Sequence, residues 1–332
     1  VFTDYFIFMR RPLIAENYGD FISVSKEKII FKNKDIVESV LFKELSYIVI
    51  KGSYVSFSSA LFLRCLKRDI PIVLLDDLDR PYSVISKFKR SAGIKERQSD
   101  FSNSKKSTDF VLKILRQKIR KQHQVLHYHI RSLRLNKGKE IKILEGYDFR
   151  YFIKLFGDLV KKRLPAIKIS RDIFLLEARS SRAYWLAFSR LFPKSIFPGR
   201  RKRNSDDPVN KLLNYGYALL SSITLKTMVL AGLDPTVPLL HHRKSLNFPF
   251  VFDLMEPFRP INDHIVISFL HKQKKDVIGR NGELRKSVLK RFRKFWFKEI
   301  KESEPWSKSK KPIEKFIIEL IEKYKKSAYI NG

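Results

Sequence analysis

A change of sequence pattern near residue 89 constrains the fold more than any other feature of this chain. Before it, short β-branched segments at 21–25, 28–31 and 47–50 read as strands, and the continuous apolar run 71–75 reads as a buried strand. After it, nearly every segment has helical spacing. The sequence therefore predicts an α+β fold, with a small β-sandwich-like domain at residues 1–88 and a larger all-helical domain at residues 111–332.

Residues 89–110 contain few groups to bury and are predicted to be a linker at the domain boundary. Residues 111–135 then predict a long basic amphipathic helix. Another helix has clear bounds: Asp207 is a natural N-cap, Pro208 suits the first position, and Gly232 ends it. From about residue 283, a basic tail carries two more amphipathic helices.

The charge of the chain indicates a polyanionic partner. Lysine and arginine number 68 against 34 acidic residues, a net charge of +34, while 44% hydrophobic content allows a buried core. Nucleic acid is the first candidate, because phosphate contacts release counterions. An anionic membrane surface is the competing interpretation.

Cys65 is the only cysteine, so neither an internal disulfide nor a cysteine-based zinc site can form. Its leucine neighbours predict a buried core thiol. No apolar run approaches the length of a transmembrane helix, and no secretory signal pattern opens the sequence. The cysteine usage indicates a reducing, cytoplasmic location. Of the two polyanionic partners we expect nucleic acid and no membrane.

Glu177 lies where a helix would present an apolar and small-residue face, formed by Ile173, Phe174, Ser180 and Tyr184. A carboxylate on such a face is costly unless it is paired. A salt bridge to Arg179 or Arg182 is the simpler explanation, and the pattern alone favours it. A functional carboxylate is the alternative.

The adjacent histidines His241 and His242 form a second candidate cluster. Adjacent side chains point in different directions on a regular backbone, so at most one of the two would usually be a ligand. Taken alone, the cluster is better explained by exposed or internally paired histidines.

Asp253 and Glu256 form the third cluster, within an aromatic and proline-rich stretch at 248–260. A capping box is the simple explanation, but Pro257 lacks the backbone donor that a helix starting after Asp253 needs. Glu256 as N-cap with Pro257 at the first helical position fits better, after a strand-like run of aromatic residues. Two carboxylates in such apolar surroundings predict a bound cation.

Three carboxylates and one histidine form an oxygen-rich ligand set that suits Mg²⁺ or Mn²⁺ better than structural zinc. In a basic protein this set indicates phosphoryl transfer. The sequence contains no Walker loop, dinucleotide turn, serine triad or kinase signature, so the corresponding enzyme classes lack support.

A basic run directly precedes the helix that Asp207 opens. A phosphate could bind there, at the helix N-terminus, although a solvated charge run explains the pattern equally well. The run consists of Arg200, Arg201, Lys202 and Arg203.

Four motifs follow one another in a recognisable order. They are residues 176–185, residues 207–217, the turn at 232–235 followed by His241, and residues 253–260. Together they resemble the CRISPR-associated protein one family, the spacer integrases, and residues 70–76 resemble that family's last β-domain segment. The resemblance covers about residues 12 to 270. The chain departs from the family pattern at Pro238, where glycine is usual, in the aromatics after Pro249, and in its long basic tail.

The resemblance implies that Glu177, His241 and Glu256 bind a Mg²⁺ or Mn²⁺ ion, with Asp253 as a supporting catalytic acid. His242 is then a neighbour that touches DNA or the side chains around the metal ligands. Further residues are expected to contact DNA because they lie in or beside the family motifs. These residues are Arg179, Arg182, Tyr184, Arg200, Arg201, Lys202, Arg203, Asn210 and Arg259.

The resemblance also implies an activity and partners. The protein would join the 3′-hydroxyl ends of short duplex DNA, the prespacer, to a CRISPR repeat beside its leader. It would act as a homodimer, with the β domain in the dimer contact and two dimers bridged by the small ferredoxin-like CRISPR-associated protein two. A transposon-encoded relative that integrates its own ends is one alternative. A non-catalytic DNA-binding scaffold is the other.

Overall fold

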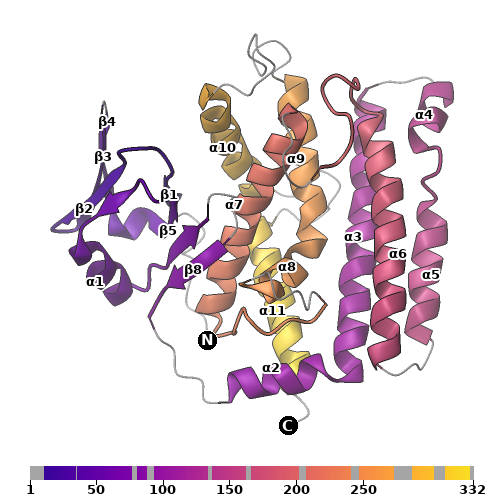
Figure 1. Ribbon diagram of the computed structural model, residues 1–332, viewed down its shortest axis with the longest axis horizontal. Helices are drawn as coiled ribbons and strands as arrows, with labels where there is room; N and C mark the ends of the chain where they lie inside the picture. The colour runs from indigo at the N-terminus through magenta and orange to yellow at the C-terminus, as the bar shows by residue number, and fades with distance from the viewer. Residues whose placement is uncertain are drawn as a thin grey trace.

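The structure is a computed structural model, and it describes residues 11–34, 36–76, 81–87, 93–133, 137–161, 166–201, 207–240, 247–272, 286–302 and 311–329. Strands gather at one side of the molecule and long helices fill the other side (Figure 1). This arrangement confirms the predicted α+β class, with a β-rich N-terminal part and a helical remainder.

Within the described residues, the N-terminal part contains two four-stranded sheets. The first has the order β1-β5-β7-β8, with β5 parallel to β1 and β7, and β8 antiparallel to β7. The second has the order β4-β3-β2-β6. Their bounds are β1 Arg11–Ala15, β2 Phe21–Ser25, β3 Lys28–Asn33, β4 Ile36–Leu41, β5 Leu45–Lys51, β6 Ser56–Phe57, β7 Ile72–Leu75 and β8 Pro81–Ile85.

A separate apolar core holds this β part together. Ile22, Ile29 and Ile48 from three strands are fully buried beside Leu61 of helix α1 (Ser59–Lys67). Cys65 on the same helix is also fully buried, which confirms the predicted core thiol.

The helical part is built around long, closely packed helices. α3, α5 and α6 lie side by side, and α7 packs against α9 (Figure 1). The bounds are α2 Ile94–Ser102, α3 Lys105–Ser132, α4 Lys137–Leu144, α5 Phe149–Lys161, α6 Ala166–Ser189, α7 Pro208–Leu230, α8 Pro249–Met255, η3 Glu256–Phe258, α9 Arg259–Lys272, α10 Lys286–Lys301 and α11 Ile313–Tyr329. No helix within these described residues is long and apolar enough to cross a lipid bilayer.

Helix α7 begins and ends as its sequence predicts. Asp207 is the N-cap, and its carboxylate accepts a hydrogen bond from the backbone N–H of Asn210 at 2.8 Å. Pro208 fills the first turn. Gly232, just past the end, has φ +77°, a conformation that side chains other than glycine's rarely adopt.

The predicted linker contains more structure than its composition indicated. Helix α2 and the start of α3 lie within residues 89–110. Gln98 is fully buried and exchanges two hydrogen bonds with the backbone of Asp234, at 3.0 and 2.8 Å. Phe101 packs edge-on against Tyr324 of the tail. These two side chains attach α2 to the helical part, so a stretch that looked polar and loose is packed. The domain boundary itself stays a prediction.

The aromatic run before Glu256 is a helix, and the prediction of a strand-like segment was wrong. Phe250, Val251, Leu254 and Met255 are fully buried at helical spacing, so packing on one face decided the backbone conformation. Glu256 is also not an N-cap, because its backbone is helical, with φ −52° and ψ −44°. It stands in a tight 3₁₀ turn that joins α8 to α9.

A close approach between α7 and α9 depends on Gly216. A β-carbon at this position would stand 1.8 Å from Oδ1 of Asn262, so no other residue fits without movement. The same oxygen accepts a hydrogen bond from Nε1 of Trp296 on α10 at 2.9 Å. The glycine therefore allows α7, α9 and the first tail helix to meet at one buried amide.

The tail helices also connect the two parts of the chain. Arg293 on α10 forms an ion pair with Glu16 at 2.6 Å, and the hydroxyl of Tyr215 on α7 donates to the same carboxylate. Lys226 on α7 is buried and pairs with Glu314 on α11. The two amphipathic helices predicted for the tail are thus present as α10 and α11, and both pack against the rest of the protein.

Candidate active site

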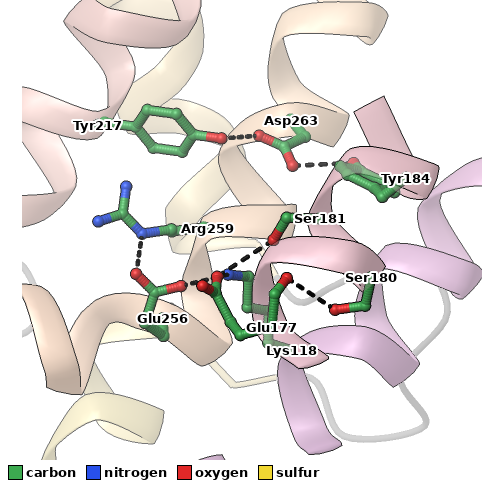
Figure 2. A network of polar contacts seen from close by, with 9 residues as sticks. All are labelled: Lys118, Glu177, Ser180, Ser181, Tyr184, Tyr217, Glu256, Arg259 and Asp263. Carbon is green, nitrogen blue, oxygen red and sulfur yellow. Dashed lines mark hydrogen bonds and ion pairs between the residues drawn. The ribbon is translucent and has the colours of Figure 1, made fainter. Parts of the chain in front are cut away.

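Two of the predicted metal ligands converge in the helical part. Glu177 comes from α6 and Glu256 from the η3 turn, and both carboxylates point toward the ammonium of Lys118 on α3 (Figure 2). The Lys118 Nζ lies 2.6 Å from Oε1 of Glu177 and 2.7 Å from Oε2 of Glu256. Ser181, one turn after Glu177, donates to the same Oε1 at 3.1 Å. Three segments far apart in sequence therefore place their charged groups at one point.

The charges of this cluster reinforce one another. Burial alone would raise the pKa of Glu177, but the ammonium of Lys118 outweighs it and leaves that pKa below its ordinary value. Burial would likewise lower the pKa of Lys118, yet Glu256 and Glu177 together raise it. Glu177 and Lys118 are accordingly both charged near neutral pH. The salt bridge predicted for Glu177 exists, but its partner is Lys118 rather than Arg179 or Arg182.

Glu256 has a second cation on its other side. The Nε of Arg259 donates to Oε1 of Glu256 at 2.7 Å. The guanidinium of Arg259 also lies 5.1 Å from the ring centre of Tyr217, and that of Arg200 lies 5.6 Å from the same ring. The predicted basic residues Arg200 and Arg259 thus share the Tyr217 ring, and Arg259 also contacts the carboxylate cluster.

Asp253 supports the segment that leads to the predicted histidine ligand. Its carboxylate is buried and accepts hydrogen bonds from the backbone N–H groups of Leu239 and Leu240, at 2.7 and 2.9 Å. The carbonyl of Pro238, the residue that departs from the family pattern, accepts a hydrogen bond from Ser102 on α2 at 2.6 Å. Asp253 therefore fixes the backbone immediately before His241. Both His241 and His242 lie outside the described residues.

A buried acid beside this cluster was not anticipated. Asp263 on α9 accepts hydrogen bonds from the hydroxyls of Tyr184, at 2.8 Å, and of Tyr217 (Figure 2). Burial raises the pKa of Asp263 to about 6, against the lowering effect of the two hydroxyls. This network fixes the Tyr217 ring, on which Arg200 and Arg259 both pack.

The residues expected to contact DNA fall into distinct environments. Arg179 and Arg182 are exposed on α6, on the helix that carries Glu177, and Arg201 is exposed after it. Tyr184 and Asn210 are fully buried, so direct contact with DNA does not fit their positions.

Asn210 instead holds Arg200. It accepts hydrogen bonds from the Arg200 side chain at 2.7 Å and from the backbone N–H of Arg201 at 2.9 Å, while Asn214 accepts from Arg200 at 2.8 Å. Lys202 and Arg203 lie outside the described residues.

Lys118 is a residue of this cluster that sequence reasoning missed. A signal was present, because Lys118 follows Leu115 by three residues and Val111 by seven, which places a charge on the apolar face of α3. Only 7% of Lys118 is exposed. A lysine buried on the inner face of a helix must have an anionic partner, and searching for that partner would have led to Glu177 and Glu256.

The cluster fits a cation, since an ammonium already lies where the buried carboxylate of Glu256 and the half-buried carboxylate of Glu177 converge. Among the described residues, no group of three or more histidine, cysteine, aspartate or glutamate side chains could hold a metal ion. The third predicted ligand, His241, falls outside those residues. Glu177 and Glu256 offer the oxygen donors that Mg²⁺ and Mn²⁺ prefer.

The fold and the site together define a class: a basic two-part protein whose helical part carries a carboxylate cluster flanked by arginines, as nucleic-acid-processing proteins do. The family model described as CRISPR associated protein Cas1 matches residues 13–296. The chain therefore belongs to the Cas1 family, as its motifs predicted.

Curated relatives have the same family name. The CRISPR-associated endonuclease Cas1 1 of Francisella tularensis subsp. novicida is 27% identical over 268 residues, which cover 80% of each chain. The CRISPR-associated endonuclease Cas1 of Korarchaeum cryptofilum is 25% identical over 278 residues, 81% of this chain and 80% of the relative. These relatives confirm the predicted function class, an integrase or endonuclease of the Cas1 family.

Solved structures share the fold over almost the whole chain. A casposase bound to integration product has a TM-score of 0.78 at 20% identity, covering 97% of this chain and 91% of its own. A Cas1 protein from Thermotoga maritima has a TM-score of 0.72 at 14% identity, covering 96% of this chain and 97% of its own.

Proposed function

We propose that this protein is a metal-dependent spacer integrase that joins the 3′-hydroxyl ends of short duplex DNA to a CRISPR repeat. The observation that carries this proposal is the convergence of Glu177 and Glu256 on one buried cation, in a chain of the Cas1 family. The net charge of +34 supports duplex DNA as the substrate, because it matches the phosphate backbone without requiring base-specific contacts.

The reaction is a one-step transesterification. The 3′-hydroxyl oxygen of the incoming strand forms a new bond to the target phosphorus, and the bond from that phosphorus to the target's own 3′-oxygen breaks. The hydroxyl proton leaves to solvent, and the departing 3′-oxygen takes one up. No bond to the protein forms. A Mg²⁺ or Mn²⁺ ion held by Glu177, His241 and Glu256 would supply positive charge to the phosphate and lower the pKa of the attacking hydroxyl.

The surrounding residues prepare this site. Asp253 holds the backbone that precedes His241, through its bonds to Leu239 and Leu240. Arg259 pairs with Glu256, and Arg200 packs on the same Tyr217 ring as Arg259, so a DNA phosphate bound there would bring compensating negative charge. Arg179 and Arg182, exposed on α6, would contact the backbone of the duplex further out.

The proposal includes partners. The protein would act as a homodimer, and two dimers would be bridged by the small companion protein Cas2 around the incoming duplex. A solved Cas6-RT-Cas1–Cas2 complex contains a chain of the same fold, with a TM-score of 0.74 at 17% identity, and motivates Cas2 as the partner to test first. The match covers 97% of this chain and 35% of that one.

A strand-joining assay tests the proposal against its nearest rival. A labelled duplex with 3′-hydroxyl ends is incubated with Mg²⁺ or Mn²⁺, with and without Cas2, and with a repeat-bearing or a repeat-free plasmid. Joining at the repeat borders, absent with 3′-dideoxy ends, is the expected result. Equal joining to both plasmids would favour a transposon-type integrase. Absence of metal-dependent joining or cleavage in every arm would favour a DNA-binding scaffold.

A further inference from the structure

The position of Lys118 raises a question about how a metal ion reaches the carboxylates. Its ammonium touches Oε1 of Glu177 and Oε2 of Glu256, at 2.6 and 2.7 Å. The residue is 7% exposed and rises from α3, a helix that also packs against α5, α6 and α9. Because the lysine is enclosed, it is not a surface group that happens to fold over the site.

The cluster is electrically balanced without any metal. Glu177 and Glu256 contribute two negative charges, and Lys118 and Arg259 contribute two positive charges within direct contact distance. A divalent cation bound to the same carboxylate oxygens would stand close to the ammonium and add two uncompensated positive charges. Both effects oppose metal binding in a buried site, where charges are weakly screened.

A DNA phosphate would restore the balance. It brings negative charge to the side of Glu256 where Arg259 lies, next to the Tyr217 ring that Arg200 also contacts, and it gives a displaced ammonium a new partner. Metal and phosphate would then each favour the binding of the other, because binding free energies are reciprocally coupled.

We propose that Lys118 is a positioning residue that holds Glu177 and Glu256 together before metal binds and competes with the metal for them, so that tight divalent-cation binding requires DNA phosphate. This inference rests on the proposed function, since it assumes that the two carboxylates bind metal. It adds a coupling between cofactor and substrate that prevents the protein from holding a reactive metal site in the absence of DNA.

The test is a calorimetric titration of Mn²⁺ into the full-length protein, with and without a short duplex DNA. For the wild type, DNA is expected to tighten Mn²⁺ binding by roughly tenfold or more, within the usual range of allosteric coupling. In Lys118→Gln, which keeps a hydrogen-bond donor but removes the charge, Mn²⁺ is expected to bind without DNA about tenfold more tightly than to wild type, or about 1.4 kcal/mol.

Two further variants control the experiment. Lys118→Arg keeps the positive charge and is expected to keep the dependence on DNA. Lys121→Met removes another lysine that is buried on the same helix, 7% exposed and near the ring of Phe258, and should leave the Mn²⁺ affinity unchanged. Thermal unfolding gives a second readout if Lys118→Gln is weakly folded. Without metal, Lys118→Gln should have a lower melting temperature than wild type, and Mn²⁺ should raise its melting temperature more than it raises that of wild type.

The outcomes separate the two levels of the account. If wild type binds Mn²⁺ and joins DNA, but Lys118→Gln binds Mn²⁺ no more tightly than wild type, the inference is overturned and the proposed function stands. If wild type binds no Mn²⁺ even with DNA, the metal assignment fails, and the inference fails with it.

Discussion

Asp253 should stabilise the chain segment before His241 more than any exposed acid does. Its carboxylate satisfies two buried backbone donors, the N–H groups of Leu239 and Leu240, at 2.7 and 2.9 Å. Asp253→Ala removes the acceptor for both buried N–H groups, and each loss lowers the free energy of unfolding by about 1–3 kcal/mol. The expected loss is therefore roughly 2–6 kcal/mol, a large part of the 5–15 kcal/mol that typically separates folded from unfolded protein.

Urea unfolding followed by circular dichroism measures this loss, and Asp253→Asn provides an intermediate case because its amide oxygen still accepts. The matched control is Asp234→Ala in the same segment. Asp234 accepts from Thr236 at 2.8 and 2.6 Å, but these bonds are exposed, so its loss should stay below about 1 kcal/mol. Equal losses for Asp253→Ala and Asp234→Ala would refute the argument from buried donors.

Three further predictions follow from particular contacts. Gly216→Ala should lose about 1–3 kcal/mol in urea unfolding, because the new methyl group collides with Asn262; a neutral result would show that the helices separate freely. Burial lowers the pKa of His264 to about 4, below the ordinary histidine value of about 6.5. The neutral imidazole therefore contributes to the free energy of unfolding above pH 6.5, and this contribution is lost as the pH falls toward 4. Over that pH range the difference in unfolding free energy between wild type and His264→Gln should decrease by roughly 3 kcal/mol. Combined Arg179→Ala and Arg182→Ala should weaken DNA binding regardless of sequence and reduce the salt dependence by about two ion equivalents; an unchanged slope would remove both from the interface.

Helix α7 shows what local sequence signals can predict. Asp207, Pro208 and Gly232 fix its ends through capping and backbone preferences that act within a few residues. The segment at 249–255 shows the limit. Its aromatic residues have strand propensity, but their burial at helical spacing decided the conformation, and the partners that bury them lie elsewhere in the sequence.

The site was predictable to the extent that its ligands lie in ordered motifs. Glu177 and Glu256 do converge, as the family resemblance implied. For Lys118 the sequence indicates only that a charge lies on the apolar face of α3 and needs an anionic partner, because the contact that identifies this partner as Glu177 spans 59 residues. The burial of Tyr184 and Asn210 is likewise a property of tertiary packing, so a motif position near DNA did not reveal that their side chains face inward.

The central claim is that Glu177 and Glu256 form a metal site for DNA joining, and Glu177→Gln tests it most directly. The measurement is Mg²⁺-dependent joining of a labelled 3′-hydroxyl duplex to a repeat-bearing plasmid, with Asp172→Asn, an exposed acid on the same helix, as the control. The joining rate of Glu177→Gln should fall by more than about 100-fold, because replacing a residue that only hydrogen-bonds to a metal ligand already lowers activity or metal affinity by about 10–100-fold. Asp172→Asn should remain near wild type. Joining by Glu177→Gln at the wild-type rate would contradict the account.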